Sequence, residues 1–189
     1  NMTHVRKLHH LACKNAKAAS IGGFFITGGL GYIGTELCKL YSGVSWHHKI
    51  IVIDSRFISE RVNQIRNWNM DFIQGDILDK NLINKYFKDA DVVHHLAGVT
   101  QVPRTKSESS AAQDEKIKEV GEKGTQNILD VISNKCKIIF PSTHVVYEGI
   151  EEVKLDIKEN EKTKPVLSYS SSKAVNEDQL KKSGKNYVI

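Results

Sequence analysis

The stretch that decides the fold is GFFITGGLGYIG, residues 23–34. A short apolar run, Gly23–Thr27, leads directly into a glycine-rich turn, and a helical pattern follows over Tyr32–Tyr41. The glycines permit a tight turn, and the start of the helix offers unpaired N–H groups and a partial positive charge. We therefore predict that residues 28–34 hold the pyrophosphate of a dinucleotide. An ordinary glycine turn between a strand and a helix is the alternative.

The rest of the chain alternates strand-like and helix-like segments. Apolar runs without period-2 polarity, such as KIIVID at residues 49–54, are typical of strands covered on both faces. Alternation of this kind predicts right-handed βαβ units and an α/β fold with a doubly wound parallel sheet. The further strands are expected at Lys49–Asp54, Met70–Gln74, Asp91–Leu96, Lys137–Phe140 and Asn186–Ile189, and the further helices at Asp79–Phe87, 112–133 and Ser168–Lys182.

The chain of 189 residues is 40% hydrophobic, enough for one substantial core. Its net charge of +5 is concentrated in residues 1–20, which hold four basic residues and no acidic one; the remaining 23 basic residues nearly balance all 22 acidic ones. We therefore expect a basic extension at 1–20 and a domain at 21–189, with no nucleic-acid partner. No apolar run reaches the length of a membrane span. Because the chain ends on the apolar Asn186–Ile189, we expect the domain to be truncated.

The cysteines and histidines give no sign of a metal site or a disulfide framework. Three cysteines stand far apart and are odd in number, which favours a reducing, cytoplasmic location. The histidine pairs lack acidic or cysteine partners at ligand spacing, so we predict no metal. These residues are Cys13, Cys38, Cys136, His9–His10, His47–His48 and His94–His95.

Asp54 ends the second expected strand, about 20 residues beyond the glycine turn. A carboxylate there would accept hydrogen bonds from the adenosine ribose hydroxyls and repel a 2′-phosphate, which favours NAD over NADP. Arg56 nearby could soften that preference. A helix N-cap or loop aspartate is the alternative for Asp54 alone.

Tyr169 and Lys173 stand four residues apart, so on a helix they share one face. A nearby cation favours the phenolate and lowers the pKa of a tyrosine, so Tyr169 could remove a proton from a substrate hydroxyl. Lys173 could also bind the nicotinamide ribose. Ser142 and Thr143 follow a buried strand of the same sheet, and either hydroxyl could bind the substrate oxygen that Tyr169 deprotonates.

These motifs together resemble the extended short-chain dehydrogenase/reductase family, the NAD-dependent nucleotide-sugar epimerases and dehydratases. The resemblance runs from about Gly23 to the last residue and implies a Rossmann-type NAD(P)-binding domain. It rests on the glycine turn, Asp54, Gly75–Ile77, His95–Gly98, Ser142–Tyr147 and Tyr169-x-x-x-Lys173. It implies that Thr143, Tyr169 and Lys173 are catalytic, and that a homodimer could form through the 112–133 and 168–182 helices. The cofactor-binding residues would be Gly28, Gly31, Tyr32, Ile33, Gly34, Asp54, Asp76, Ile77, Leu96, Ala97, Gly98, Ser142, Tyr169 and Lys173.

Several residues depart from the family pattern, and one departure argues against dehydration and decarboxylation. Dehydratases and decarboxylases typically carry a glutamate two positions after the catalytic threonine, often preceded by an aspartate, whereas His144 and Val145 stand here. Gly121 replaces the asparagine three residues before Gly124, and Glu148 is inserted into the usual V-Y-G. The family's carboxyl-terminal substrate lobe lies outside the sequence.

We therefore expect an NAD-dependent, UDP-glucose 4-epimerase-type enzyme that acts on a nucleotide-sugar substrate by oxidising and re-reducing a sugar carbon. Two alternatives stay open. One is a net reductase or dehydrogenase acting on a sugar nucleotide or a carbonyl compound, and the other is a catalytically silent dinucleotide-binding domain.

Overall fold

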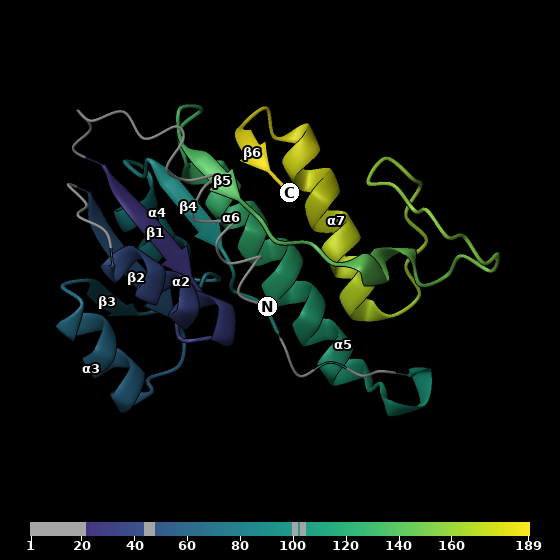
Figure 1. Ribbon diagram of the computed structural model, residues 1–189, viewed down its shortest axis with the longest axis horizontal. Helices are drawn as coiled ribbons and strands as arrows, with labels where there is room; N and C mark the ends of the chain where they lie inside the picture. The colour runs from purple at the N-terminus through teal and green to yellow at the C-terminus, as the bar shows by residue number, and fades with distance from the viewer. Residues whose placement is uncertain (1–21, 44–47, 100–101, 103–104) are drawn as a thin grey trace.

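The computed structural model describes residues 22–43, 48–99, 102 and 105–189. Six strands form one parallel sheet in the order β3-β2-β1-β4-β5-β6, with helices on both faces (Figure 1). This order confirms the predicted doubly wound sheet, and its direction of winding reverses between β1 and β4. The strands are β1 (Gly23–Thr27), β2 (Lys49–Asp54), β3 (Asp71–Gln74), β4 (Val92–His95), β5 (Lys137–Ile139) and β6 (Asn186–Val188).

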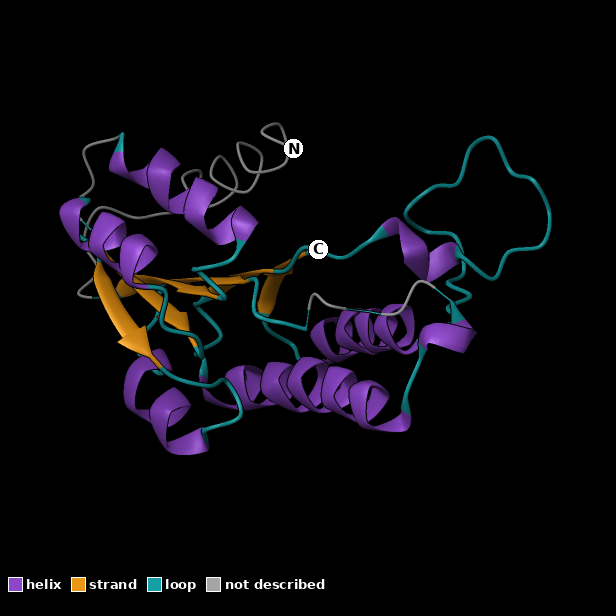
Figure 2. Cartoon of the chain, turned by 90° about the horizontal axis from the view of Figure 1, so that it is seen from below, coloured by secondary structure: helices purple, strands orange, loops and turns teal. Residues whose placement is uncertain are grey.

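The helices lie in two layers, which Figure 2 shows above and below the sheet. On one face α2 (Tyr32–Ser42) and α3 (Ser59–Asn67) cover Phe24, Ile26 and Val52. On the other face α4 (Lys80–Phe87), α6 (Gly124–Val131) and α7 (Ser168–Lys182) cover Phe25, Ile51 and Val93. Successive residues of β1 therefore enter opposite cores, as the continuous apolar run required.

The predicted helix at 112–133 is one helical path in three parts. It consists of α5 (Ala111–Lys118), a π-helical turn η2 (Glu119–Lys123) and α6. A π turn inserts an extra residue and changes the direction of the following side chains. Gly121, at the middle of this turn, packs against Ser172 and Asn176 of α7.

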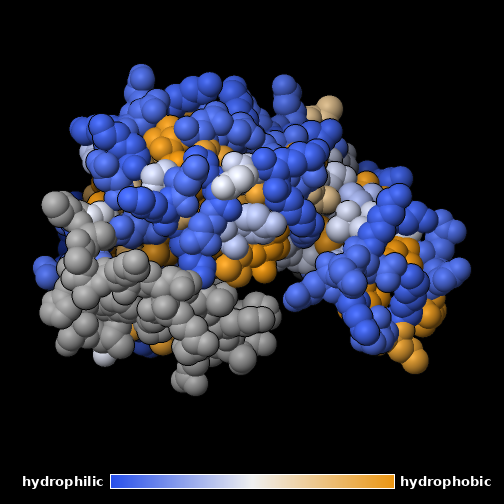
Figure 3. Space-filling view, turned by 90° about the horizontal axis from the view of Figure 1, so that it is seen from above, coloured by the Kyte–Doolittle hydropathy of each residue, from blue (hydrophilic) through white to orange (hydrophobic). Residues whose placement is uncertain are grey.

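Two short 3-10 helices, η1 (Lys106–Glu108) and η3 (His144–Tyr147), complete the elements. The polar segment 151–164 forms a loop that projects from the body (Figures 1 and 2). It exposes Val153 and Leu155 almost completely. Figure 3 shows hydrophobic side chains among hydrophilic ones on a projecting part of the surface.

Three points differ from the sequence-based expectation, and one prediction falls outside the described residues. Helix α3 was missed because only Val62 and Ile65 of its nine residues are buried. The strands expected at Met70–Gln74, Asp91–Leu96, Lys137–Phe140 and Asn186–Ile189 are one or two residues shorter. Helix α4 begins at Lys80, because Asp79 is its N-cap and accepts hydrogen bonds from the N–H groups of Asn81 and Leu82. The extension at 1–20 lies outside the described residues.

Candidate active site

The glycine turn between β1 and α2 lies tight against the end of β4. Gly28 has φ +66°, and a Cβ atom on it would lie 2.7 Å from the backbone N of Ala97 and 2.8 Å from its Cα. A Cβ on Gly34 would lie 2.5 Å from the Cα of Gly29. Neither position has room for a side chain, so the loop and the helix start pack backbone to backbone.

The first turn of α2 is arranged to accept an anion. Gly31 is the N-cap, and it has no side chain that could cover the N–H groups of the helix start. Tyr32 and Ile33 are exposed, and the first turn holds no acidic residue. A cradle that a Cβ would fill, followed by an open helix N-terminus, fits a dinucleotide pyrophosphate.

Asp54 ends β2 and is 5% exposed. Its carboxylate accepts hydrogen bonds from the backbone N–H of Leu30 at 3.0 Å and of Arg56 at 3.0 Å. The Arg56 guanidinium also binds it, through Nε at 3.0 Å and through NH2 at 3.1 Å. The hydrogen bond to Asp54 raises the pKa of Arg56 despite the opposing effect of its partial burial. Asp54 is thus placed as predicted, but the guanidinium occupies the oxygens that a ribose diol would use.

The residues expected near adenine take different orientations. Asp76 is exposed, and its carboxylate accepts a hydrogen bond from the Leu78 N–H at 2.9 Å. The Ile77 side chain is 3% exposed and packs against Gly124 in the core. Any contact between Ile77 and a cofactor would therefore be made by its backbone.

A buried polar chain supports the segment Leu96–Gly98. The hydroxyl of Thr27 accepts hydrogen bonds from the N–H groups of Leu96 at 3.2 Å and Ala97 at 3.1 Å. It also bonds to His95 Nδ1 at 2.9 Å, and His95 Nε2 bonds to the hydroxyl of Thr125 at 2.9 Å. Burial lowers the pKa of His95 to about 3, and the positive charge of Lys173 makes a smaller contribution in the same direction. A neutral imidazole thus connects the glycine turn to α6.

That chain also defines the tautomer of His95. The Thr125 hydroxyl donates its proton to the Gly121 carbonyl at 2.6 Å, so it accepts from His95 Nε2–H. Nδ1 then accepts the proton of Thr27. Every member of the chain is satisfied in this arrangement, so it is a rigid support rather than a site of chemistry.

Tyr169 and Lys173 lie on one side of α7, as their spacing predicts. Lys173 Nζ donates a hydrogen bond to the Pro141 carbonyl at 3.1 Å and lies 4.2 Å from the centre of the Phe140 ring. Burial lowers its pKa to about 8. The ammonium lies 6.0 Å from the centre of the Tyr169 ring.

The expected fall in the pKa of Tyr169 is wrong for this arrangement. Burial raises that pKa above the usual value of a tyrosine. Helical spacing fixes the face on which a side chain lies but not its rotamer, and the lysine extends to the nearest carbonyl oxygen instead.

Ser142 and Thr143 follow β5, at the carboxyl edge of the sheet. Ser142 donates its hydroxyl proton to Glu177 Oε1 of α7 at 2.6 Å. The Thr143 hydroxyl caps η3 by accepting from the Val145 N–H at 3.4 Å, and its own proton stays available for another acceptor. Of the two, Thr143 is better placed to meet a substrate oxygen.

Two acidic residues near the candidate site were missed by the sequence analysis. Glu177 stands four residues after Lys173, a spacing that would have placed it on the same face of α7. Glu148 binds the amino end of α7 through the Val166 N–H, the Leu167 N–H and the Ser170 hydroxyl. No local sequence signal reveals such a contact, because about twenty residues separate the partners.

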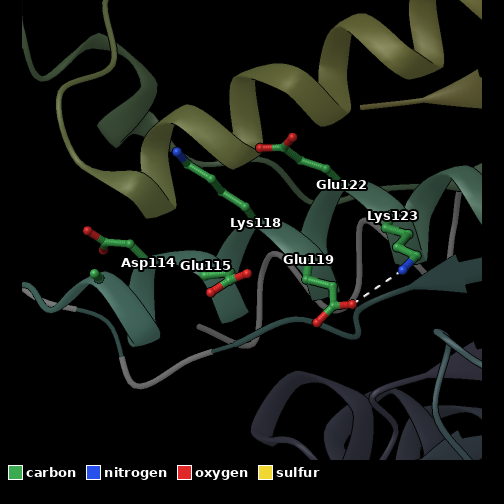
Figure 4. A pocket seen from close by; sticks show the side chains of 7 residues that line it. Asp114, Glu115, Lys118, Glu119, Glu122 and Lys123 are labelled. Atoms are coloured by element: carbon green, nitrogen blue, oxygen red, sulfur yellow. Dashed lines mark hydrogen bonds and ion pairs between the residues drawn. The ribbon is translucent and has the colours of Figure 1, made fainter.

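The other features of the surface do not add to this site. Figure 4 shows an open hollow lined by charged side chains of α5 and η2, where Lys123 pairs with Glu119 at 3.3 Å. None of its lining residues is a predicted site residue, although Asp114 forms a side-chain hydrogen bond with Ser168, next to Tyr169. Among the described residues there is no cluster of three or more potential metal ligands, and no helix there has the length and apolar character needed to cross a membrane.

Comparisons with known proteins identify the family of the chain. The model of the NAD dependent epimerase/dehydratase family matches residues 24–189. CDP-paratose 2-epimerase of Salmonella typhi is 34% identical over 150 residues, 73% of this chain and 41% of that protein. dTDP-D-glucose 4,6-dehydratase of Dictyostelium discoideum is 31% identical over 166 residues, 79% of this chain and 37% of that protein.

The chain also resembles solved structures of nucleotide-sugar epimerases. The crystal structure of UDP-glucose 4-epimerase from Brucella ovis in complex with NAD superposes with a TM-score of 0.69 at 27% identity. The match covers 88% of this chain and 50% of that one. The chain thus spans half the length or less of these relatives. Matched over almost all of its described residues, the chain belongs to the NAD-dependent epimerase/dehydratase family.

Proposed function

We propose that the protein is an NAD-dependent nucleotide-sugar epimerase of the UDP-glucose 4-epimerase type. The observation that carries this proposal is the placement of Tyr169 and Lys173 beside the segment that ends in Thr143, through the bond from Lys173 to the Pro141 carbonyl. This segment follows β5, whose carboxyl end lies at the same sheet edge as the glycine turn. The combination supports a cofactor and an acid–base pair in one cleft.

The cofactor side of the proposal rests on Gly28–Gly34 for the pyrophosphate and on Asp54 for the adenosine ribose. When bound, NAD accepts a hydride from a sugar carbon and later returns it. Arg56 would have to leave Asp54 for the ribose hydroxyls to bind in its place.

The chain's own residues would move the proton. Tyr169 would take it from a sugar hydroxyl, commonly at C4 in this family. Lys173 would hold the nicotinamide ribose and stabilise the phenolate, and Thr143 would orient the same sugar oxygen. Because the pKa of Tyr169 is raised and Lys173 is bonded to Pro141, we infer that the ammonium turns toward Tyr169 during the cycle.

Val145 favours epimerisation over dehydration. It stands in the segment after Thr143, where an eliminating enzyme needs a carboxylic acid to assist the departure of water. The neighbouring His144 is exposed. A keto-sugar formed at this site would therefore be reduced again on its other face rather than lose water.

Turnover of the full-length protein with paired sugar nucleotides tests the proposal. Interconversion of UDP-glucose and UDP-galactose without net NADH supports it, whereas stoichiometric NADH formation indicates a dehydrogenase. A Tyr169→Phe variant should lose at least about 100-fold in kcat, because it removes the acid–base group. Turnover equal to wild type in that variant would contradict the assignment.

Three further parts of the proposal await separate tests. We propose that residues 21–189 form the cofactor domain, that the protein works in the cytoplasm, and that it forms a homodimer through the helical regions 112–133 and 168–182. The two buried free thiols, Cys38 and Cys136, are compatible with a reducing compartment. Sedimentation of the full-length protein measures the oligomeric state.

A further inference from the structure

Glu148 reaches the amino end of the helix that carries Tyr169. Its Oε1 accepts hydrogen bonds from the N–H groups of Val166 and Leu167, both at 2.8 Å, and from the hydroxyl of Ser170. Tyr169 lies between these partners in the sequence. The carboxylate therefore forms hydrogen bonds with residues on both sides of Tyr169, the candidate acid–base group.

The start of α7 needs such a partner. Its N-cap is Leu167, which has no side-chain acceptor for the N–H groups that a helix leaves free at its start. A carboxylate also complements the positive end of the helix dipole. Although partial burial raises the pKa of Glu148, the hydrogen bonds from Ser170, Leu167 and Val166 outweigh it and lower the pKa below its usual value. The group is thus held as the anion that this position favours.

Glu148 also belongs to the Thr143 side of the site. Its backbone N–H donates to the Val145 carbonyl at 3.1 Å, at the end of the short helix η3 that Thr143 caps. The following residue, Gly149, donates its N–H to the Lys164 carbonyl at 2.8 Å, and the Lys164 N–H donates to the Val146 carbonyl at 2.8 Å. These bonds close the base of the projecting loop. One residue therefore joins the segment after Thr143 to the turn before Tyr169.

The other links between these segments lie further along α7. They are the bond from Lys173 to the Pro141 carbonyl and the bond from Ser142 to Glu177. Both act one turn or more after Tyr169. The first turn of α7 has local bonds, from the Ser170 hydroxyl to the Leu167 backbone and between Ser168 and Asp114 of α5, but these do not reach the Thr143 segment. Glu148 supplies the link between that segment and the first turn.

We propose that Glu148 is a positioning residue, which fixes the Tyr169 turn of α7 against the Thr143 segment and thereby sets the rate of proton transfer. This inference rests on the proposed function. Glu148 touches neither the glycine turn nor Asp54 in the described contacts, so cofactor affinity should not depend on it. An error of about 1 Å in the placement of a reacting group can cost about 100-fold in rate.

The test compares Glu148→Ala, Glu148→Gln and the control Glu161→Ala in the full-length protein. Glu161 lies in the same loop and pairs with Lys154 at 3.0 Å, and within the described part of the chain it makes no bond to α7. We expect Glu148→Ala to lower kcat between about 10-fold and 100-fold, with the KM for the sugar nucleotide and the Kd for NAD changed less than about twofold. Glu148→Gln keeps an acceptor oxygen and should recover most of the rate, and Glu161→Ala should match wild type.

Amide hydrogen exchange in the same variants separates this inference from the proposed function. Exchange at Val166 and Leu167 should accelerate in Glu148→Ala, while that of the β1 amides should stay as in wild type. If the wild-type protein does not epimerise, the proposed function fails. The positioning role is then tested by comparing amide exchange and the titration of the Tyr169 phenol between wild type and Glu148→Ala. Unchanged kcat in Glu148→Ala, unchanged exchange, or a matching loss of rate, NAD affinity and β1 protection would each overturn the inference. Should Glu148→Ala not fold, Glu148→Gln against Glu161→Ala carries the comparison.

Discussion

Replacing Gly28 by alanine tests whether the glycine turn is held by its close approach to β4. Two effects act at this position. The backbone has φ +66°, and a Cβ would lie 2.7 Å from the Ala97 nitrogen. Gly184 offers a matched control, because it has φ +67° and no atom within 4 Å of its would-be Cβ.

The two variants should lose different amounts of unfolding free energy, because only one of them brings a methyl group against the backbone. A left-handed conformation costs an L-residue about 1–2 kcal/mol, and both alanines incur that cost. The gain from a stiffer unfolded chain is the same in both and cancels in the comparison. Gly28→Ala also pushes a methyl group into the backbone of Ala97, which cannot rotate away, and overpacking of this kind costs about 1–3 kcal/mol more. We therefore expect Gly28→Ala to lose roughly 2–5 kcal/mol of unfolding free energy and Gly184→Ala roughly 1–2 kcal/mol.

Urea unfolding, monitored by circular dichroism, measures these losses of unfolding free energy. Calorimetric titration measures the affinity for NAD. Gly28→Ala should also weaken NAD binding, because the turn must move away from Leu96–Gly98, while Gly184→Ala should bind NAD as wild type does. Equal stability losses in the two variants would refute the reasoning, since the backbone contact would then contribute nothing.

Three further predictions address charges around the site. Arg56→Ala should tighten NAD binding several-fold and weaken NADP binding, because it frees Asp54 for the ribose hydroxyls and removes a cation near the 2′-position; titration with both cofactors measures this. His95 has a pKa of about 3 when folded, so between about pH 6.5 and pH 3 the unfolded chain binds a proton that the folded chain does not. Stability should then fall by about 1.4 kcal/mol per pH unit as the pH drops through this window, and urea titrations of His95→Gln should lack that contribution. Burial lowers the pKa of Lys173 from its ordinary value of 10.5 to about 8 in the folded protein, so the unfolded chain binds more protons between these pH values. Stability should therefore rise with pH across this window in wild type and not in Lys173→Met, and turnover of the full-length Lys173→Met variant should be lost.

The sheet could be predicted because its strands carry an unambiguous signal. Runs such as Ile50–Ile53 have no polar face, which only a strand covered on both sides tolerates. Helix α3 carries almost no such signal. It buries only two residues, Val62 and Ile65. Its N-cap is Ile58, and isoleucine is rarely found at the start of a helix.

The places of the candidate site residues in the fold could be predicted, but their contacts could not. Asp54 and the Tyr169–Lys173 pair lie where the motifs placed them, since strand ends and helix faces follow from the fold. Which partner each group binds depends on side chains distant in sequence, such as the Pro141 carbonyl that holds Lys173. Gly121 illustrates the same limit. The sequence shows only that Gly121 replaces an asparagine of the family pattern, and the structure adds that its carbonyl accepts a hydrogen bond from Asn176 of α7 at 3.0 Å.

These contacts together make α7 the element on which the proposed chemistry depends. Its first turn is held by Glu148, its middle by Lys173 and Asn176, and the next turn by the bond from Ser142 to Glu177. The partners come from residues 141–148 and from η2, so the helix cannot shift as a rigid rod without breaking several bonds at once. The side chain of Lys173 can still exchange its carbonyl partner for the phenolate of Tyr169 by rotation about its own bonds. Under the proposed function, activation of Tyr169 therefore needs only a change of the Lys173 rotamer while α7 stays in place. Loosening the start of α7 at Glu148 should then slow proton transfer without changing the affinity for NAD.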